Sequence, residues 1–324
     1  MAHLKWGILG ASNFAATHMG PAIHAARGAE LAALATSSLE KAARFSAFAP
    51  GITVHQSYDD LINDDAIDAI YIPLPNHLHV EWSLKALEAG KHVLCEKPMA
   101  MRSDQFDQII AARDSSGKLA AEAYMIVHHP QFQRAKELVA EGALGPVKHV
   151  DAVFSYFNSD TGNIRNQADA GGGGLPDIGV YTFGSVRFVT GEEPETIPFA
   201  HIEWENDVDV FVQMAARFPS FTYGAVVSMR LFNRQQVVFH GEKGVLTVSC
   251  PFNAAVHDQA ELVLETEGKV RTVERFPGVN HYVLQVEAFC RSADTGVPYA
   301  CPLEFSKGTQ RMIDMTFDAA KSRG

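Results

Sequence analysis

Short apolar runs alternate with helical patterns through the first third of the chain. Strand-like runs cover residues 4–9, 30–35, 53–54, 68–72, 92–95 and 119–123. Helical patterns cover residues 13–27, 38–48, 58–63, 76–89 and 104–115. Gly28 and Gly90 are helix stops, Pro21 interrupts the first helix, and Asn76 is placed to cap the fourth. The pattern predicts an α/β domain with a doubly wound parallel sheet over residues 1–123.

Beyond residue 123 the pattern changes to strands in succession. One more helix is expected at 132–141, and further helices near 177–190, 281–293 and 304–321. Strands are expected at 147–157, 208–217, 223–230, 234–240, 244–249, 260–265 and 270–275. Turn signals such as the segment 241–244 separate them. We therefore expect residues 124–324 to form an α+β domain with a large, mostly antiparallel open sheet.

Composition excludes several classes of protein. The 324 residues are 47% hydrophobic and carry a formal net charge of -11, with no dense Lys/Arg block, so nucleic acid is not an expected partner. An apolar run of about 18 residues is missing, which argues against a membrane span. The four cysteines lack Cys-x-x-Cys spacing, and the first ten residues lack the apolar stretch of a signal peptide. We expect reduced thiols, a cytoplasmic location and no metal site.

The turn after the first strand resembles a dinucleotide-binding fingerprint. That fingerprint has the form Gly-x-Gly-x-x-Gly/Ala, and Gly10 and Ala15 match it while Ser12 replaces the middle glycine. A serine still lets backbone N–H groups face a pyrophosphate. The expected cofactor-binding residues here are Gly10, Ser12, Asn13, Phe14 and Ala15.

The end of the second strand indicates which dinucleotide binds. An acid that binds the ribose 2′-hydroxyl of NAD is missing, and Thr36, Ser37 and Ser38 are followed by Lys41. Hydroxyls and a cation suit a 2′-phosphate, so NADP is favoured over NAD. The alternative is a capped helix with a solvated basic face.

Two clusters carry candidate chemistry. Glu96, Lys97 and Pro98 end a buried strand, where ligands bind in open parallel sheets, and the proline can take a cis bond. Asp177 and Tyr181 are four residues apart, so on a helix they share a face. A glycine run at 171–174 precedes them and lets the backbone approach a ligand closely.

Taken together, these residues resemble the glucose-fructose oxidoreductase / inositol dehydrogenase family. The matching segments, which span most of the chain, are Gly10–Ala15, Pro75–His79, Glu96–Pro98, Glu122–Tyr124 and Gly171–Tyr181. The resemblance implies an N-terminal Rossmann domain and a C-terminal domain whose open sheet forms a homodimer or homotetramer. It also implies that Pro73, Leu74, Asn76 and His79 lie near the cofactor, although Asn76 is equally explained as a helix cap. Tyr124 is a candidate pocket wall, and Arg165, just before the glycine run, is a candidate ligand of sugar hydroxyls.

Tyrosine at position 181 resembles one branch of this family, which holds dihydrodiol dehydrogenase and aldose 1-dehydrogenases. We therefore expect hydride transfer between nicotinamide and a monosaccharide or related polyol, with an aldose 1-dehydrogenase as first choice. A trans-dihydrodiol dehydrogenase, a ketosugar reductase of 1,5-anhydrofructose type and a non-catalytic NADP-binding regulator are the alternatives.

A hypothetical mechanism follows. Tyr181 exchanges the proton with the substrate oxygen, and the Lys97 ammonium lowers the pKa of Tyr181 from about 10. Asp177 holds Lys97 or a substrate hydroxyl, and Glu96 binds the nicotinamide ribose.

Overall fold

A computed structural model describes residues 3–254 and 256–321. The chain divides into two compact units, of which the first contains residues 1–125 and 280–307 and the second residues 126–279 and 308–324. The sequence boundary near residue 123 assigned everything after it to the second domain. The structure instead returns residues 280–307 to the first unit, because their apolar face packs there.

The first unit is built on a six-stranded parallel sheet of order β3-β2-β1-β4-β5-β6. Its strands are β1 (Leu4–Leu9), β2 (Ala29–Ala35), β3 (Thr53–His55), β4 (Ala69–Ile72), β5 (His92–Cys95) and β6 (Ala120–Glu122). Its helices are α1 (Gly20–Ala25), α2 (Leu39–Ser46), α3 (Tyr58–Ile62), α4 (His79–Glu88), α5 (Gln105–Ser116) and α8 (His281–Thr295). The prediction of a doubly wound parallel sheet is confirmed.

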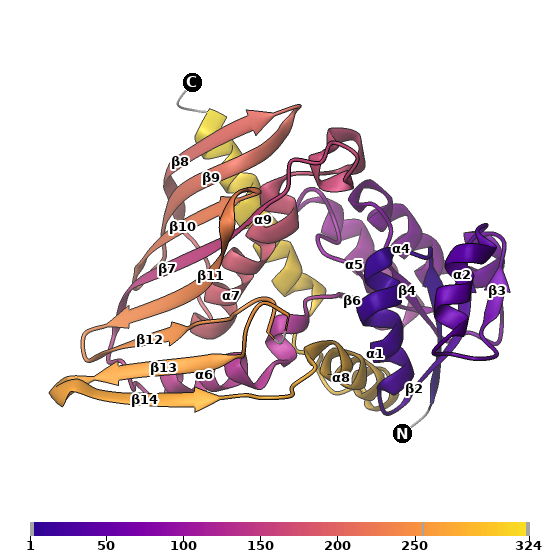
Figure 1. Cartoon of the computed structure of the whole chain (residues 1–324), viewed down its shortest axis with the longest axis horizontal. Helices are drawn as coiled ribbons and strands as arrows, with labels where there is room; N and C mark the ends of the chain where they lie inside the picture. Colours follow the sequence, from indigo (N-terminus) through magenta and orange to yellow (C-terminus); the bar gives the residue numbers. More distant parts are fainter. Residues whose placement is uncertain (1–2, 255, 322–324) are drawn as a thin grey trace. The chain divides into compact units, whose positions relative to one another are not determined.

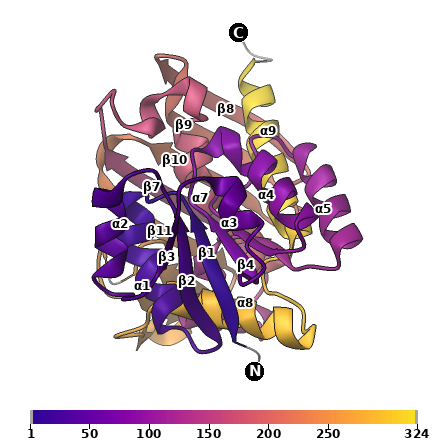
Figure 2. The same ribbon diagram turned by 90° about the vertical axis from the view of Figure 1, so that its right-hand side faces the viewer.

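Helices cover both faces of this sheet (Figure 2). Alternate strand residues point to opposite faces, so Trp6 and Leu9 of β1 belong to different cores. Leu9 joins a buried cluster with Leu87 of α4 and Phe106 of α5. On the other face the Trp6 ring lies 5.1 Å from the Phe289 ring of α8, between centroids. This contact is one reason why α8 belongs to the first unit.

The helix starts differ in detail from the predicted ones. A π-helical turn (Ala15–Met19) precedes α1, and Pro21 lies in the first turn of α1 rather than within a continuous helix. Asn76 begins a short 3₁₀ turn (Asn76–Leu78), and α4 starts at His79 with no side-chain cap. The prediction that Asn76 caps this helix is therefore wrong, because the 3₁₀ turn moves the helix start past it.

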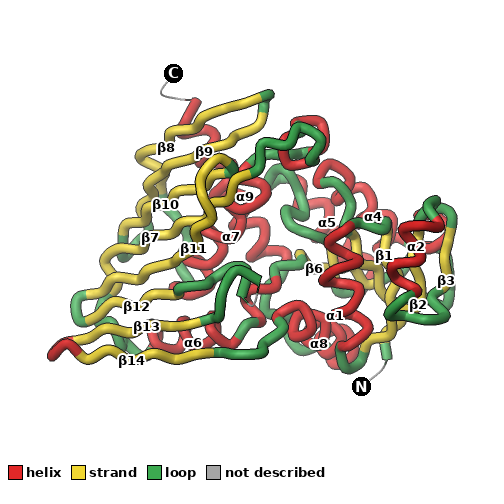
Figure 3. Tube along the Cα trace, viewed as in Figure 1, coloured by secondary structure: helices red, strands yellow, loops and turns green. Residues whose placement is uncertain are grey.

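The second unit contains an eight-stranded sheet of order β14-β13-β12-β11-β7-β10-β9-β8 (Figures 1 and 3). Its strands are β7 (Val147–Phe157), β8 (Thr196–Glu205), β9 (Val208–Arg217), β10 (Thr222–Ser228), β11 (Arg230–Gly241), β12 (Gly244–Val248), β13 (Glu261–Thr266) and β14 (Val270–Arg275). Only β7 and β10 pair in parallel among these strands, so the predicted mostly antiparallel sheet is confirmed.

Three helices lie over one face of the second sheet: α6 (Pro130–Ala140), α7 (Val180–Thr190) and α9 (Leu303–Lys321), of which α9 begins in the first unit. Strand β8 was not predicted. It is an edge strand whose residues are mostly exposed, and Pro198 interrupts its pattern. An edge strand with one neighbour needs no apolar alternation, so the sequence carries no period-two signal there.

Candidate active site

A cavity of about 480 Å³ opens at the carboxyl ends of β1, β2 and β4 in the first unit. This is the edge of an open parallel sheet at which ligands bind. Predicted residues that line it are Gly10, Ser12, Thr36, Ser37, Ser38, Lys41, Pro73 and Leu74. Lining residues that were not among the expected cofactor-binding residues are Ala11, Gln56, Ser57, Tyr58 and Pro75.

Gly10 shapes the floor of this cavity. Its φ of 92° lies in the left-handed region, which residues with a side chain rarely adopt. A Cβ at this position would lie 3.1 Å from Leu74 Cδ2 and 3.2 Å from the Tyr58 hydroxyl. A side chain at position 10 is therefore strained by the backbone conformation and would press closely on Leu74 and Tyr58.

The polar wall of the cavity is made by the start of α2. The Ser38 hydroxyl accepts a hydrogen bond from Lys41 N at 3.2 Å and caps this helix, and Thr36 Oγ1 accepts one from Ser38 N at 3.2 Å. These bonds hold three consecutive hydroxyl residues and Lys41 along one wall. A helix N-terminus, hydroxyl groups and an ammonium together favour a phosphate.

Ser12 lines this cavity, whereas Asn13, Phe14 and Ala15 of the fingerprint lie outside it. The Ser12 hydroxyl accepts a hydrogen bond from Ala15 N at 3.1 Å, which fixes the first helical turn. Asn13 Oδ1 accepts a hydrogen bond from Arg44 at 2.6 Å. The Phe14 ring packs 5.6 Å from that of Tyr282, between centroids, so its side chain serves the packing of α8.

Glu96 and Lys97 follow β5, and the Lys97–Pro98 peptide bond is cis. Glu96 accepts a hydrogen bond from the Tyr71 hydroxyl at 2.7 Å and one from Lys97 N at 3.3 Å. Burial raises the pKa of Glu96, and Lys97 opposes that rise. Met99, two residues after Lys97, is also fixed, because its backbone N–H donates a hydrogen bond to Glu122 Oε1 at 2.8 Å. The loop that carries Lys97 is thus fixed by hydrogen bonds on either side, of which the one from Met99 is buried.

His79 joins this loop to the wall of the cavity. Its buried ring places Nδ1 2.7 Å from Pro98 O and Nε2 2.7 Å from Leu74 O. Burial lowers the pKa of His79 to about 4, although both carbonyls favour the charged ring. A neutral ring carries one N–H and serves one carbonyl at a time, whereas a charged ring serves both. Since both ring nitrogens face protein groups, the influence of His79 on a cofactor passes through these two backbone segments.

Asp177 is the centre of a polar cluster in the second unit. The Tyr156 hydroxyl donates to Asp177 Oδ2 at 2.6 Å, and Arg165 Nε lies 2.9 Å from the same oxygen. The Asp177 carboxyl raises the pKa of Arg165. The pKa of Tyr156 is also raised, mainly by burial and secondly by the negative charge of Asp177. Tyr156 therefore remains a neutral donor and Arg165 a cation. Such a set of charged and hydroxyl groups is suited to binding a polyhydroxylated ligand.

Tyr181 lies one turn beyond Asp177, at the start of α7. The segment begins as a π-helical turn (Leu175–Gly179) and continues as α7. The helical segment therefore starts two residues before the predicted start at residue 177. The Tyr181 side chain is mostly buried, with ring centroids 5.9 Å from Phe154 and 5.8 Å from Phe252. These aromatic contacts from β7 and the 250s loop fix the ring.

Asp209 of β9 binds the backbone just after the glycine run at 171–174. Asp209 Oδ2 accepts a hydrogen bond from Leu175 N at 2.6 Å, and burial raises the pKa of Asp209 to about 7. Gly173 has a φ of 130°, and a Cβ there would lie 2.1 Å from Asp209 Oδ1. Glycine at position 173 thus allows the backbone to pack directly against the buried Asp209 carboxyl.

Other predicted site features have simpler surroundings. Tyr124 belongs to the first unit and is buried, with its ring 6.1 Å from that of Phe305 between centroids. Within residues 3–254 and 256–321, no group of three or more His, Cys, Asp or Glu side chains is arranged to hold a metal. Over the same residues, no helix has the length and apolar character that crossing a bilayer requires.

Sequence reasoning missed three polar residues of the second unit. Tyr156 and Asp209 lie on β7 and β9, and Arg230 begins β11. The sequence pattern predicts a strand at each of these positions and no role in a site. A polar residue inside an apolar strand was the available signal, because a buried polar group needs a partner.

Two family models match the chain in succession. Residues 4–124 match the model described as "Oxidoreductase family, NAD-binding Rossmann fold", and residues 132–247 match the "GFO/IDH/MocA C-terminal domain". The chain therefore belongs to the Gfo/Idh/MocA oxidoreductase family.

Similar proteins extend over nearly the whole chain. An uncharacterized oxidoreductase of Rhizobium meliloti is 35% identical, over 96% of this chain and 95% of that protein. A D-xylose 1-dehydrogenase (NADP(+)) of Haloferax volcanii is 32% identical, over 98% of each. A crystal structure of a 3-ketoreductase from Actinomadura kijaniata, in complex with NADP and TDP-benzene, matches with a TM-score of 0.90 and 28% identity over 98% of this chain and 97% of that one. The resemblance to this family that the motifs indicated is thus confirmed.

Proposed function

We propose that this protein is an NADP-dependent oxidoreductase that transfers a hydride between nicotinamide and a carbinol or carbonyl carbon of a monosaccharide or related polyol. The observation that carries this proposal is the cluster of Tyr156, Arg165 and Asp177 beside Tyr181. It supplies donors and acceptors of the kind that vicinal hydroxyls need, in a chain whose other unit has a dinucleotide-binding fold. The named xylose dehydrogenase and 3-ketoreductase relatives support the same class of substrate.

The cavity wall supports NADP over NAD. Where an NAD-binding sheet has an acid at the end of its second strand, this chain has Thr36, Ser37 and Ser38, with Lys41 beside them. A carboxylate there would repel a 2′-phosphate, whereas the ammonium and the hydroxyls attract it. NADP would therefore be held with its 2′-phosphate at the start of α2.

Each candidate residue has a proposed role in the reaction. The nicotinamide accepts a hydride from the substrate carbon in the oxidative direction. Tyr181 takes the hydroxyl proton as the C=O bond forms, and Lys97 serves the same proton transfer. Asp177, paired with Arg165, holds a neighbouring hydroxyl of the substrate. We propose in addition that Glu96 binds the nicotinamide ribose.

An aldose 1-dehydrogenase, which forms a lactone, is the first choice within this class. A ketosugar reductase is the second, because the similar Actinomadura kijaniata protein is a 3-ketoreductase. A trans-dihydrodiol dehydrogenase and a non-catalytic NADP-binding regulator stay as further alternatives.

A steady-state screen tests the proposal. NADP and NAD would each be offered with pentoses, hexoses, inositols and trans-diols, and NADPH with ketosugars. We expect turnover with at least one aldose and NADP. Turnover only with a diol or only with a ketosugar would select an alternative, and NADP binding without turnover would support a regulator. A preference for NAD of more than about tenfold would refute the reading of the cavity wall.

We also propose that a second copy of this chain covers the open face of the second sheet, so that the protein is a homodimer or homotetramer. A hollow of about 730 Å³ lies over β7, β9, β10 and β11, and Phe232 beside it is 89% exposed. Exposed apolar surface of this kind marks an interface. Light scattering should give a dimer or larger for the native chain and a smaller species for Phe232→Glu; a native monomer would overturn this.

The cytoplasmic location also stays a prediction, and all four cysteines are buried and free.

A further inference from the structure

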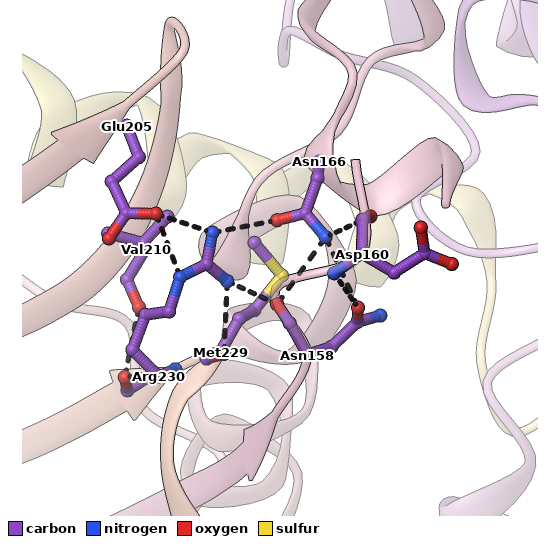
Figure 4. Close-up of polar contacts among 8 residues, drawn as sticks. Asn158, Asp160, Asn166, Glu205, Val210, Met229 and Arg230 are labelled. Carbon is purple, nitrogen blue, oxygen red and sulfur yellow. Dashed lines mark hydrogen bonds and ion pairs between the residues drawn. The ribbon is translucent and has the colours of Figure 1, made fainter. Parts of the chain in front are cut away.

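The guanidinium of Arg230 joins three segments of the second unit (Figure 4). Its Nε and Nη2 donate to Glu205 Oε2 of β8 at 2.9 and 2.7 Å. Nη2 also donates to Asn166 Oδ1 at 2.9 Å, and Nη1 donates to the backbone carbonyls of Asn158 and Met229. One side chain therefore fastens the loop after β7 to the strands β8 and β11.

Asn166 is the point at which this loop is fixed. Its side-chain oxygen faces Arg230, and its Nδ2 donates to Asp160 O at 2.9 Å and to Asn158 O and Oδ1 at 3.4 and 3.3 Å. Because a guanidinium only donates, it fixes which end of the Asn166 amide points toward it. Asn166 is also buried, so its amide must keep these partners.

The residue before Asn166 is Arg165, which pairs with Asp177. The backbone of Arg165 is held on its other side by the glycine run, since Gly173 N donates to Arg165 O at 2.9 Å. A Cβ at Gly172 would lie 2.5 Å from that same carbonyl oxygen. Arg165 thus lies between two fixed points, namely the Arg230–Asn166 contact and the glycine backbone.

Arg230 also acts on the cluster by charge. Burial and Asp177 raise the pKa of Tyr156, and both Arg165 and Arg230 oppose that rise. The Arg230 charge therefore reaches the group that donates to Asp177. Its role is nevertheless an indirect one, because its hydrogen bonds go to the loop and to Glu205.

We propose that Arg230 is a positioning residue for substrate binding: through Asn166 it sets the place of Arg165, and thereby the geometry of the Arg165–Asp177 pair. This rests on the proposed function of that pair in holding a substrate hydroxyl. Loss of the contact should weaken sugar binding more than it slows the reacting step, since Tyr181 and Asp177 lie on a segment held separately by Asp209.

Kinetics of Arg230→Met test this proposal with the full-length protein. We expect the KM for the sugar found by the screen to rise about tenfold or more, with kcat within about threefold and the KM for NADP unchanged. Arg230→Lys, which keeps the charge but loses the planar fork, should recover part of the loss. A matched control is Arg275→Met, which breaks an ion pair of similar length to Glu261 at the distant sheet edge and should change neither constant. An unchanged sugar KM in Arg230→Met would overturn the proposal.

Hydrogen exchange separates this proposal from the proposed function. In Arg230→Met the amides of Asn166, Gln167 and Gly173 should exchange faster, because their hydrogen bonds lie within the loop, while amides of β9 and β10 keep their protection. Unchanged exchange in the loop would overturn the proposal even if the enzyme turns over no sugar. If the native chain turns over no sugar, diol or ketosugar, the proposed function fails and this measurement still decides whether Arg230 holds the loop. Should Arg230→Met not fold, Asn166→Leu removes the contact with Arg230 from the loop side, and Glu205→Gln removes the charge that Arg230 pairs with. Both variants are judged by the same two measurements.

Discussion

The cavity at the strand ends of the first unit and the Asp177 cluster of the second unit are built in different ways. The cavity is lined by short consecutive stretches at strand ends, 10–12, 36–38, 56–58 and 73–75, with small or hydroxyl side chains. The cluster joins single polar side chains from separate elements: Tyr156 from β7, Arg165 from a loop and Asp177 from the start of the α7 segment. Such a cavity offers a ligand mainly backbone N–H groups, hydroxyls and a helix N-terminus, so apart from Gly10 it should tolerate most single substitutions. The cluster does not, because Asp177 is buried and loss of Tyr156 or Arg165 removes a partner from its carboxylate.

The largest effect is expected at Tyr181 and Lys97. Tyr181→Phe and Lys97→Met should each lower turnover about 10²- to 10⁴-fold, because a proton donor or acceptor at the reacting oxygen is lost. Single-turnover measurements with NADP and the best sugar would report this. Tyr223→Phe is the matched control, since its hydroxyl donates to Thr182 O in the same unit and its loss should cost little activity. Turnover of Lys97→Met within about tenfold of the native value would contradict the proposed mechanism.

His79 is an exception to the difference between the two units, because it is a buried polar residue beside the cavity of the first unit. His79→Ala removes a buried ring that spans two loops and should destabilise the protein by about 3 kcal/mol. It should also raise the KM for NADP about tenfold, because Leu74 lines the cavity and Pro98 follows Lys97. Urea unfolding and steady-state kinetics would measure the two effects. The exposed neighbour His77→Ala should leave both unchanged; equal effects at the two positions would show that the ring has no special role.

Substitution of Lys41 should have a moderate and selective effect. Lys41→Ala removes the ammonium from the wall of the cavity and should raise the KM for NADP about tenfold while leaving that for NAD unchanged. Lys41→Arg should retain most of the preference, and Glu40→Ala, its neighbour on α2, is the control for general damage to the helix. A parallel change with both cofactors would mean that Lys41 does not contact the 2′-phosphate.

Asp209 should have the smallest effect on activity, and its contribution should be visible as a pH dependence of stability. The folded-state pKa of about 7 is raised above the usual value of a carboxyl, so the folded protein holds a proton that the unfolded chain releases. The stability that this proton contributes is present at low pH and is lost as pH rises from about 4 to about 7. The slope is up to about 1.4 kcal/mol per pH unit. Asp209→Asn, which resembles the protonated acid, should flatten that part of the curve in urea unfolding between pH 5 and pH 8. Identical slopes for the two proteins would be evidence against a protonated Asp209.

Local patterns were sufficient to predict most of the fold. The six parallel strands and seven of the eight strands of the second sheet were predicted, because a buried strand or helix face repeats at a fixed period. Strand β8 was missed since an exposed edge strand has no such repeat. The place of α8 was also missed, because an amphipathic pattern shows that a helix packs but not against which unit.

For the candidate site, sequence and structure contributed different parts. The sequence alone determined the local motifs: Gly10, Thr36–Ser38 with Lys41, and Glu96–Pro98 at strand ends, and Asp177 with Tyr181 on a helix. Each is local, since the residues act together within a turn or two of the chain. Only the tertiary structure decided that Tyr156 and Arg165 both bind one oxygen of Asp177. It also decided that Asp209 packs against the glycine run, and that Arg230 binds Asn166 in the loop that precedes this run. These partners come from different strands and a loop. The physical requirement that they meet is that a buried charge or amide must be paired, and this requirement identifies no partner until the chain has folded.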